Sequence, residues 1–392
     1  MKGAKAGYIV FYTIGLITMV AIGLRCGSND PQKTQQSENQ QIERASQFKN
    51  LHDTIDYVGM QKCRQCHEDK YQSFKKTGMG QSFDTAHKAK SAGRFDGHQL
   101  VYDSFKNLYY EPFWKEDDLY VKEFKLNGQG DTTFKRVEQI DYIIGSGQHT
   151  NSHMYAVNGY IYQAPFTFYT QEEQWDLPPG YELGNNSRFT RPIGIECMSC
   201  HNAYPDFESS SKNKFSHLPS GIDCERCHGP GELHVKEKQA GNIVDIENGT
   251  DHTIVNPSKL PNQLKNDVCQ RCHLQGNAVL KEGKSFFDFK PGMNLSTVMD
   301  VFRPVYKKED AFIMASHSER LQQSKCFKST QDHQTFEPLN CITCHNPHKS
   351  VESTSSQYFN KTCQSCHKEE KEDELVKCAK PLSERISIND NN

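Results

Sequence analysis

The 392-residue sequence has few hydrophobic residues for its length. Only 35% of its residues are hydrophobic, and its mean hydropathy is −0.79. A chain this long could hold two or three ordinary domains, but this composition leaves their cores underfilled. We therefore expect something other than side chains to supply part of the apolar interior, as metals and disulfides do in very small domains.

The sequence also lacks a strong excess of one charge and a repeat of fixed period. Its formal net charge is −3 and its pI is about 6.6, so it has no basic surface of the kind that nucleic-acid binding requires. Its recurring motif, described next, stands at unequal intervals. Unequal spacing excludes a solenoid.

Cysteine, by contrast, is abundant and regularly placed. Twelve of the fifteen cysteines lie in six Cys-x-x-Cys-His pentads: Cys63/Cys66/His67, Cys197/Cys200/His201, Cys224/Cys227/His228, Cys269/Cys272/His273, Cys341/Cys344/His345 and Cys363/Cys366/His367. Two thiols at this spacing can form thioethers with the two vinyl groups of one haem, and the adjacent imidazole then becomes an axial ligand of the iron. The pentads predict six covalently attached haem c groups and a redox function.

Zinc binding and dithiol chemistry explain the pentads less well. A zinc site pairs two Cys-x-x-Cys units and has no need of a histidine after every second cysteine. A dithiol oxidoreductase needs one motif beside a strand and a helix, not six. We therefore expect haem packing to form much of the core, and the chain without haem not to fold.

Residues 1–26 predict a signal or membrane anchor. The apolar run Tyr8–Leu24 follows Lys2 and Lys5, which is the order of an export signal. Thioether attachment also belongs to an oxidising compartment. We expect a location in the bacterial cell envelope, anchored to a membrane and exposed to the periplasm or the cell surface.

Two modes of anchoring stay open. Cys26 stands where a bacterial lipoprotein carries its lipid, although Arg25 is a poor neighbour for cleavage. The alternative is an uncleaved helix, which at about 1.5 Å per residue would be about 25 Å long and marginal for a bilayer. An unmodified thiol is the third interpretation of Cys26.

The remaining chain predicts an α+β protein in which short helices and irregular chain wrap around haems, with a β-rich insertion. Short β-branched and aromatic runs predict strands at Leu100–Tyr102, Leu119–Val121 and Val137–Ile144, and Asn158-Gly159 predicts a hairpin turn. The expected segments are a disordered tether (27–50), a first haem segment (51–96), the β-rich insertion (97–171), a main multihaem segment (172–378) and a tail (379–392).

The ligand on the second face of each iron decides between electron transfer and substrate binding. His348 and His234 follow a motif too closely to reach round their own haem, so as ligands they would serve a neighbouring iron. The candidates are His149, His234, His317 and His348, then His87, His153 and His217, and also Met79, which could equally fill a core.

Four arginines and two further cysteines each have two possible roles. Four arginines could pair with haem propionates or stay solvated: Arg188, Arg191, Arg226 and Arg271. Cys326 and Cys378 could form a disulfide, but their spacing does not indicate proximity.

Longer strings around the motifs carry a family resemblance. Ile143–Gly147 with His149, Ile195–Asn202, Gly221–Gly231 and Cys341–His348 resemble the envelope multihaem c-type cytochromes often fused to tetratricopeptide repeats. That group is related to the tetrahaem cytochromes that accept electrons from hydroxylamine oxidoreductase. The resemblance extends from about Cys63 to Cys366 and implies mainly bis-histidine haems, with His149, His234, His317 and His348 at the positions of the family's extra histidines.

The chain departs from that family in two respects. No helical repeat array follows the motifs, so the partner platform of longer relatives is missing. The segment Val376–Ser383 is reminiscent of a further Cys-x-x-Cys-His site without its second cysteine and histidine, which leaves the role of Cys378 in doubt.

These observations favour a hexahaem carrier of single electrons over an enzyme. Its partners would be envelope redox proteins or quinol-linked donors. The alternative is a multihaem oxidoreductase that acts on a small nitrogen or sulfur compound at a haem with an open face. The chain has no Cys-x-x-Cys-Lys motif of ammonia-forming nitrite reductases, and we assign no catalytic residue.

Overall fold

A computed structural model describes residues 47–274, 276–302, 317–331 and 337–367. The chain separates into two compact units, Met1–Gln47 and Phe48–Asn392. The expected anchor, most of the expected tether, the tail and Cys378 lie outside the described residues. Within the described ranges, no helix has the length and apolar character needed to cross a bilayer.

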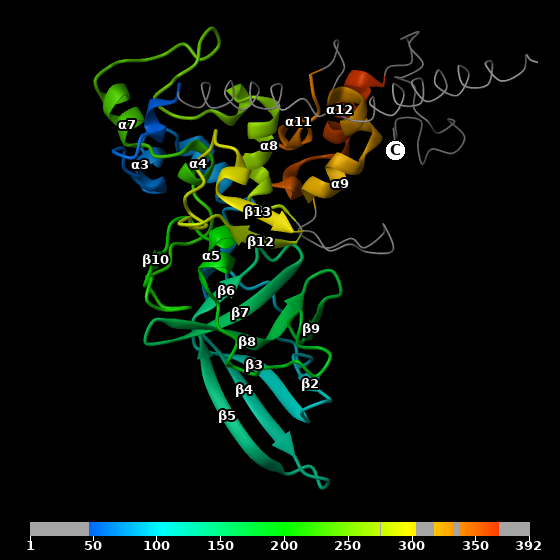
Figure 1. Cartoon of the computed structure of the whole chain (residues 1–392). Coiled ribbons are helices and arrows are strands. Elements are labelled where there is room, and N and C mark those ends of the chain that lie inside the picture. The colour runs from blue at the N-terminus through cyan, green and yellow to red at the C-terminus, as the bar shows by residue number, and fades with distance from the viewer. Residues whose placement is uncertain (1–46, 275, 303–316, 332–336, 368–392) are drawn as a thin grey trace, which may run out of the picture. The chain divides into compact units, whose positions relative to one another are not determined.

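Two antiparallel sheets form the β-rich part of the second unit (Figure 1). A four-stranded meander contains β2 (Val101–Asp103), β3 (Leu108–Lys115), β4 (Asp118–Leu126) and β5 (Thr132–Ile140). A five-stranded sheet has the order β1 (Phe83–Thr85), β6 (Tyr142–Ile144), β7 (Thr150–Val157), β8 (Tyr160–Tyr169) and β9 (Gln174–Asp176). These strands begin before and end after the limits of 97–171 expected from the sequence.

Local sequence explains both a turn and a break in these strands. Asn158 and Gly159 both have positive φ angles, as a tight turn between β7 and β8 requires, and this confirms the predicted hairpin. The predicted run Val137–Ile144 is instead divided between the two sheets at Asp141. The Asp141 carboxylate accepts a hydrogen bond from the Ala156 N–H at 2.6 Å, which holds the chain where it leaves one sheet for the other.

The two sheets share one hydrophobic core. Alternate residues of β3 and β4 are buried, and they pack with residues of β7, β8 and β9 in a single cluster of fifteen buried residues. Tyr110, Leu119, Ala164 and Phe166 in this cluster are fully buried. Alternation of apolar and polar residues therefore builds this part without any cofactor.

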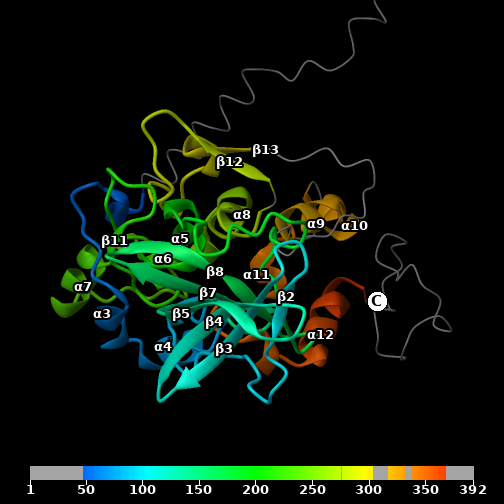
Figure 2. The ribbon, with the colours of Figure 1, turned by 90° about the horizontal axis from the view of Figure 1, so that it is seen from below.

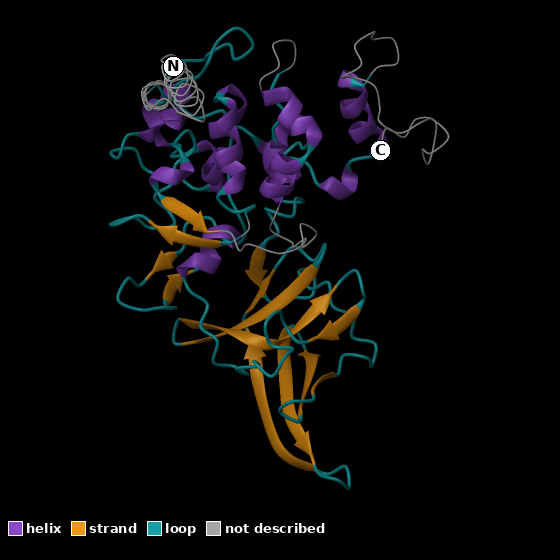
Figure 3. Ribbon diagram, turned by 45° about the vertical axis from the view of Figure 1, so that its right-hand side comes forward, coloured by secondary structure: helices purple, strands orange, loops and turns teal. Residues whose placement is uncertain are grey.

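The motifs lie mainly on short helices, and apart from α5 these gather at the end of the second unit away from the two large sheets (Figure 3). In the view from below, the helices lie around and behind the sheets (Figure 2). The helices are α3 (Met60–Arg64), α4 (Glu68–Phe74), α5 (Ile195–His201), α6 (Glu225–His228), α7 (Glu232–Gln239), α8 (Asn262–Gln270), α9 (His317–Gln323), α10 (Lys325–Gln331), α11 (Cys341–Cys344) and α12 (Ser356–Cys366). Four 3₁₀ turns join them in the described ranges: η1 (Lys49–Leu51), η2 (Pro257–Lys259), η3 (Leu295–Thr297) and η4 (Val351–Ser353). Helices this short are not stable alone, so contacts with their surroundings must hold them.

Two small antiparallel ribbons complete the arrangement, and α5 connects it to the sheets. The ribbons are β10 (Asp206–Phe207) with β11 (Phe215–His217), and β12 (Asn277–Leu280) with β13 (Met299–Phe302). Met198 of α5 is fully buried against Phe83, Met154 and Ile161 of the five-stranded sheet. The protein therefore has the mixed α+β class predicted from the sequence.

Candidate haem-binding site

Each pentad folds as one helical turn. In five of them, the histidine N–H donates to the carbonyl of the first cysteine: His67 to Cys63 at 3.0 Å, His228 to Cys224 at 3.0 Å, His273 to Cys269 at 3.0 Å, His345 to Cys341 at 3.1 Å and His367 to Cys363 at 2.9 Å. The remaining pentad lies inside α5. Helical neighbours three and four residues apart share a face, so each motif presents two thiols and one imidazole on one side. None of these twelve cysteines forms a disulfide with another described residue.

The twelve motif cysteines differ in how far they are exposed. Cys66 and Cys197 are exposed, whereas the other ten are partly buried. Cys66 follows α3, a helix that buries no residue, and its N–H donates to the Cys63 carbonyl at 3.2 Å. The polypeptide therefore covers Cys63 better than Cys66, and the thioether at Cys66 stays a prediction from the pentad.

We number the motifs one to six in chain order. Three of their histidines lie beside a second imidazole from elsewhere in the chain. His67 lies 6.3 Å from His234 between ring centroids, with nearly parallel planes at 20°. His228 lies 6.0 Å from His348, at 13°. The structure thus brings each of these two candidates to the proximal histidine of a different motif.

His317 makes a similar pair in a different orientation. It is the first residue of α9, and its ring lies 5.3 Å from that of His273 with the planes at 83°. Motif four therefore also has a second imidazole close to its proximal histidine.

The ring separations of His67 from His234 and of His228 from His348 fit an iron between the two imidazoles. Two metal–nitrogen bonds of about 2 Å each, in line through one metal, place the ring centroids about 6 Å apart. The residues present therefore suit a haem with histidine on both faces.

Hydrogen bonds hold two of these imidazoles through Nδ1. His228 Nδ1 lies 2.8 Å from the Val255 carbonyl. His234 Nδ1 lies 3.1 Å from Thr253 Oγ1 and 3.2 Å from Asp251 Oδ2. These acceptors favour a proton on Nδ1 and leave Nε2 for a metal, which is how partners of ligating histidines commonly act.

Burial favours the neutral, metal-binding form of three of these histidines. It lowers the pKa of His228 and His234, and it lowers the pKa of His348 to about 4. The imidazolium is penalised in an apolar surrounding, whereas the neutral ring keeps a lone pair for the metal. His201 of motif two behaves in the same way, because burial lowers its pKa to about 4.

Other ligand candidates have different surroundings. His149 is exposed, and among the described residues no proximal imidazole lies in ring contact with it. The Met79 carbonyl accepts from Ile222 N–H at 3.1 Å, so Met79 lies beside the chain that leads into motif three. His87 and His217 are exposed. His153 is fully buried in the sheet core, where its ring lies 4.3 Å from that of Phe166.

Residues that orient the imidazoles were not found from the sequence. Asp251, Thr253 and Val255 belong to an irregular segment between α7 and α8, without a motif of their own. They reach His228 and His234 only through the tertiary fold, so the local sequence carried no signal for them.

Thiols of different motifs also contact one another. Three pairs of thiols lie close enough for one to raise the pKa of the other: Cys224 raises that of Cys63, Cys272 that of Cys200, and Cys341 that of Cys269. Electrostatic interactions further link Cys227 with Cys272, and Cys344 with Cys363. These contacts join the motifs in the series one, three, four, five and six, with motif two joined at motif four.

Packing between helices supports the later part of this series. Helix α8, which carries Cys269, packs against α9 and α11, and α11 packs against α12. The Asn266 side-chain oxygen in α8 accepts from the Cys341 N–H at 3.3 Å. The attachment points of motifs four, five and six are therefore neighbours in space.

Comparison with known families gives two matches. The family described as "Cytochrome c554 and c-prime" matches residues 62–105 and 182–229, which contain motifs one, two and three. The family described as "Doubled CXXCH motif" matches residues 333–372, which contain motifs five and six. Motif four lies in neither match.

Individual relatives are more distant. The "Multiheme cytochrome MtrA" of Shewanella baltica (strain OS185) is 26% identical over 239 residues, or 58% of this chain and 68% of the relative. The solved structure "Crystal Structure of Outer Cell Wall Cytochrome OcwA" shares 19% identity with a TM-score of 0.38, covering 63% of this chain and 45% of that chain. The chain thus spans less than half of that solved structure. The family and MtrA matches confirm the resemblance to multihaem c-type cytochromes and support covalently attached haem c.

Proposed function

Multihaem c-type cytochromes are the group that this chain resembles, and from that premise we propose that it carries six haems and passes single electrons between redox partners. The observation that carries the proposal is the pairing of His67 with His234 and of His228 with His348. An iron with histidine on both faces has no site for a substrate and keeps its coordination when its charge changes. Such sites suit electron transfer better than catalysis.

The chain's own residues would position and tune the sites. Bound haem supplies the one-electron couple of its iron. The motif histidines and cysteines fix each site to a short helical turn, and Val255, Thr253 and Asp251 orient imidazoles through Nδ1. Contacts among the motif thiols support a continuous series of neighbouring sites, with motif two as a side branch at motif four.

Location and partners belong to the same proposal. The positively charged, then apolar, N-terminal order supports export to the cell envelope and a membrane anchor, either a lipid at Cys26 or a single span. Its partners would be envelope redox proteins or quinol-linked donors, which meet electron carriers through small, transient interfaces.

Motif two supplies an observation in favour of a second function. Among the described residues, neither His201 nor His345 has a second imidazole in ring contact, unlike His67, His228 and His273. His345 is exposed, whereas His201 is half-buried. A haem held there with an open face could bind a small nitrogen or sulfur compound. The alternative proposal is therefore an oxidoreductase whose substrate site is the haem of motif two.

Two measurements on the purified holoprotein test these proposals. The mass of the denatured protein should exceed the polypeptide mass by six haems, and a smaller increment would contradict the hexahaem count. Electron paramagnetic resonance of the oxidised protein should show low-spin signals alone. A high-spin signal that shifts on addition of nitrite or hydroxylamine would favour the oxidoreductase.

A further inference from the structure

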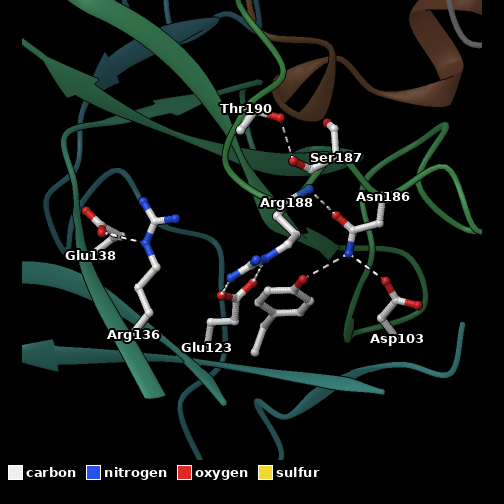
Figure 4. Close-up of polar contacts among 9 residues, drawn as sticks. Asp103, Glu123, Arg136, Glu138, Asn186, Ser187, Arg188 and Thr190 are labelled. Carbon is white, nitrogen blue, oxygen red and sulfur yellow. Dashed lines mark hydrogen bonds and ion pairs between the residues drawn. The ribbon is translucent and has the colours of Figure 1, made fainter. Parts of the chain in front are cut away.

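The four arginines near the motifs fall into two classes. Arg188 donates to the Glu123 carboxylate, with Nε at 2.8 Å from Oε1, in a polar network on the sheets (Figure 4). Arg191 is exposed and donates to the Pro179 carbonyl at 3.2 Å. Both of these arginines therefore have partners in the protein and no need of another anion.

Arg226 is different because it is buried with unused donors. Its side chain is 2% exposed. One nitrogen, Nη2, donates to the Ser199 carbonyl, whereas Nε and Nη1 are buried with no hydrogen-bond partner among the described residues. The guanidinium lies 4.4 Å from the Phe287 ring centroid and 5.0 Å from that of Tyr204, which hold it in place.

Arg271 repeats this arrangement in motif four. Each of the two arginines stands directly before the second cysteine of its motif. Arg271 is 7% exposed, its guanidinium lies 5.5 Å from the Phe289 ring centroid, and Nη1 is buried without a partner in the described part of the chain. Two independent motifs thus present a buried guanidinium with a free donor.

A buried cation with unpaired N–H groups costs several kcal/mol, so a partner is expected in the complete protein. The nearby carboxylates do not supply one. Glu225 accepts from the N–H groups of Val58, Gly59 and Gly231. Asp223 accepts from the Arg226 backbone N–H at 3.1 Å, and burial, together with the charge of Glu225, raises its pKa to about 6.

We propose that the Arg226 side chain, and in the same way that of Arg271, is a binding site for a carboxylate of haem. Each haem brings two propionates, and a buried guanidinium N–H without a partner suits a charge-assisted hydrogen bond to a carboxylate oxygen. Covalent attachment of haem is the premise of this inference; six haems or electron transfer are not needed for it.

The position of Arg226 gives this site a role in assembly. The Ser199 carbonyl that accepts from Arg226 lies in motif two, and the Cys272 thiol of motif four lies 3.9 Å from the same oxygen. Motifs two, three and four therefore meet at Arg226. A propionate bound there would tie a haem to the branch point of the series.

The test uses the holoprotein with ¹³C-labelled haem propionates and compares Arg226→Lys and Arg226→Gln with Arg191→Gln. Infrared difference spectra of the oxidised and reduced protein report the labelled carboxylates, and spectroelectrochemistry reports the midpoint potentials. We expect Arg226→Gln to shift a labelled carboxylate band and lower at least one potential. Arg226→Lys should shift the band but retain most of the potential, because it keeps the charge and loses the planar guanidinium.

Arg191→Gln is the matched control and should change neither measurement. If Arg226→Gln does not mature, the Arg226→Lys protein still decides the question, since its labelled band must shift. Labelled bands and potentials that match the unmodified protein in the Arg226 variants would overturn the inference and indicate that water satisfies the guanidinium. That result would leave the proposed electron transfer standing.

Discussion

The sheets and the motif-bearing helices obtain their apolar interior from different sources. The sheets share fifteen buried residues of their own. In contrast, α3, α7, α11 and α12 contain no buried residue, although α12 is eleven residues long. The sheets fold around their own side chains, whereas these helices bury none and, in the proposed function, haem would supply their apolar cover.

The largest expected effect is loss of the helical region when haem is absent. A chain with the motif cysteines replaced by serine should keep the two sheets folded, because their shared cluster of fifteen buried residues contains no motif residue. Helices α3, α11 and α12 should lose their structure, since haem binding contributes their folding free energy. Hydrogen exchange with mass spectrometry would show protected sheet peptides beside rapidly exchanging helical peptides. Equal protection in both regions would contradict the comparison.

A cavity in the sheet core should destabilise the sheets and leave the motif-bearing helices unchanged. Phe166 is fully buried and contacts His153 and Trp175. Phe166→Ala should lower the free energy of unfolding of the sheets by about 3–5 kcal/mol, measured by urea-dependent hydrogen exchange, with the haem absorbance unchanged in the absence of urea. Phe105→Ala is the control: Phe105 is 66% exposed, so its replacement should cost less than about 0.5 kcal/mol.

Acid should weaken the sheets through His153. Burial lowers the pKa of His153 to about 3 from an ordinary value near 6.5. The unfolded chain binds this proton at a higher pH than the folded chain, so stability falls as pH decreases from about 6.5 towards 3. His153→Phe should remove a few kcal/mol of this pH dependence at most. The check is sheet hydrogen exchange at pH 4 and pH 7; an unchanged pH dependence in the variant would refute the assignment.

The smallest expected change in global stability is at a single axial position. His234→Ala should convert one haem from low-spin to high-spin and leave the sheets intact, because His234 lies beside His67 and outside the sheet core. Electron paramagnetic resonance would detect the new high-spin signal. The matched control is His217→Ala at an exposed position of β11, which should leave the spectrum unchanged. No high-spin signal in the His234 variant would show that another group ligates that iron.

The sequence predicted those parts of the fold that depend on neighbouring residues. Asn158-Gly159 specified the hairpin because its turn geometry is local. The break at Asp141 was not predicted, because it depends on the hydrogen bond from Ala156 on a later strand. Strands β1 and β9 contain only three residues each, too few for a periodic pattern to reveal them.

In the candidate site, too, the sequence predicted the residues that depend on their neighbours in the chain and not those that depend on the tertiary fold. The proximal residues follow from the pentads, since two thiols and an imidazole are fixed within one helical turn. The sequence also indicated that His234 and His348 would serve a neighbouring iron, but it could not name His67 and His228 as their partners. Likewise, four arginines near the motifs looked equivalent until burial separated Arg226 and Arg271 from the partnered Arg188 and Arg191.

The pairing of early and late histidines fixes an order of completion during synthesis. The ribosome makes His67 long before His234, and His228 long before His348. If these pairs ligate iron as proposed, each site holds one imidazole until the later segment is made, and a chain that stops before residue 348 lacks the second ligand of motif three. A truncation just after motif four should thus impair an upstream site whose own pentad is intact.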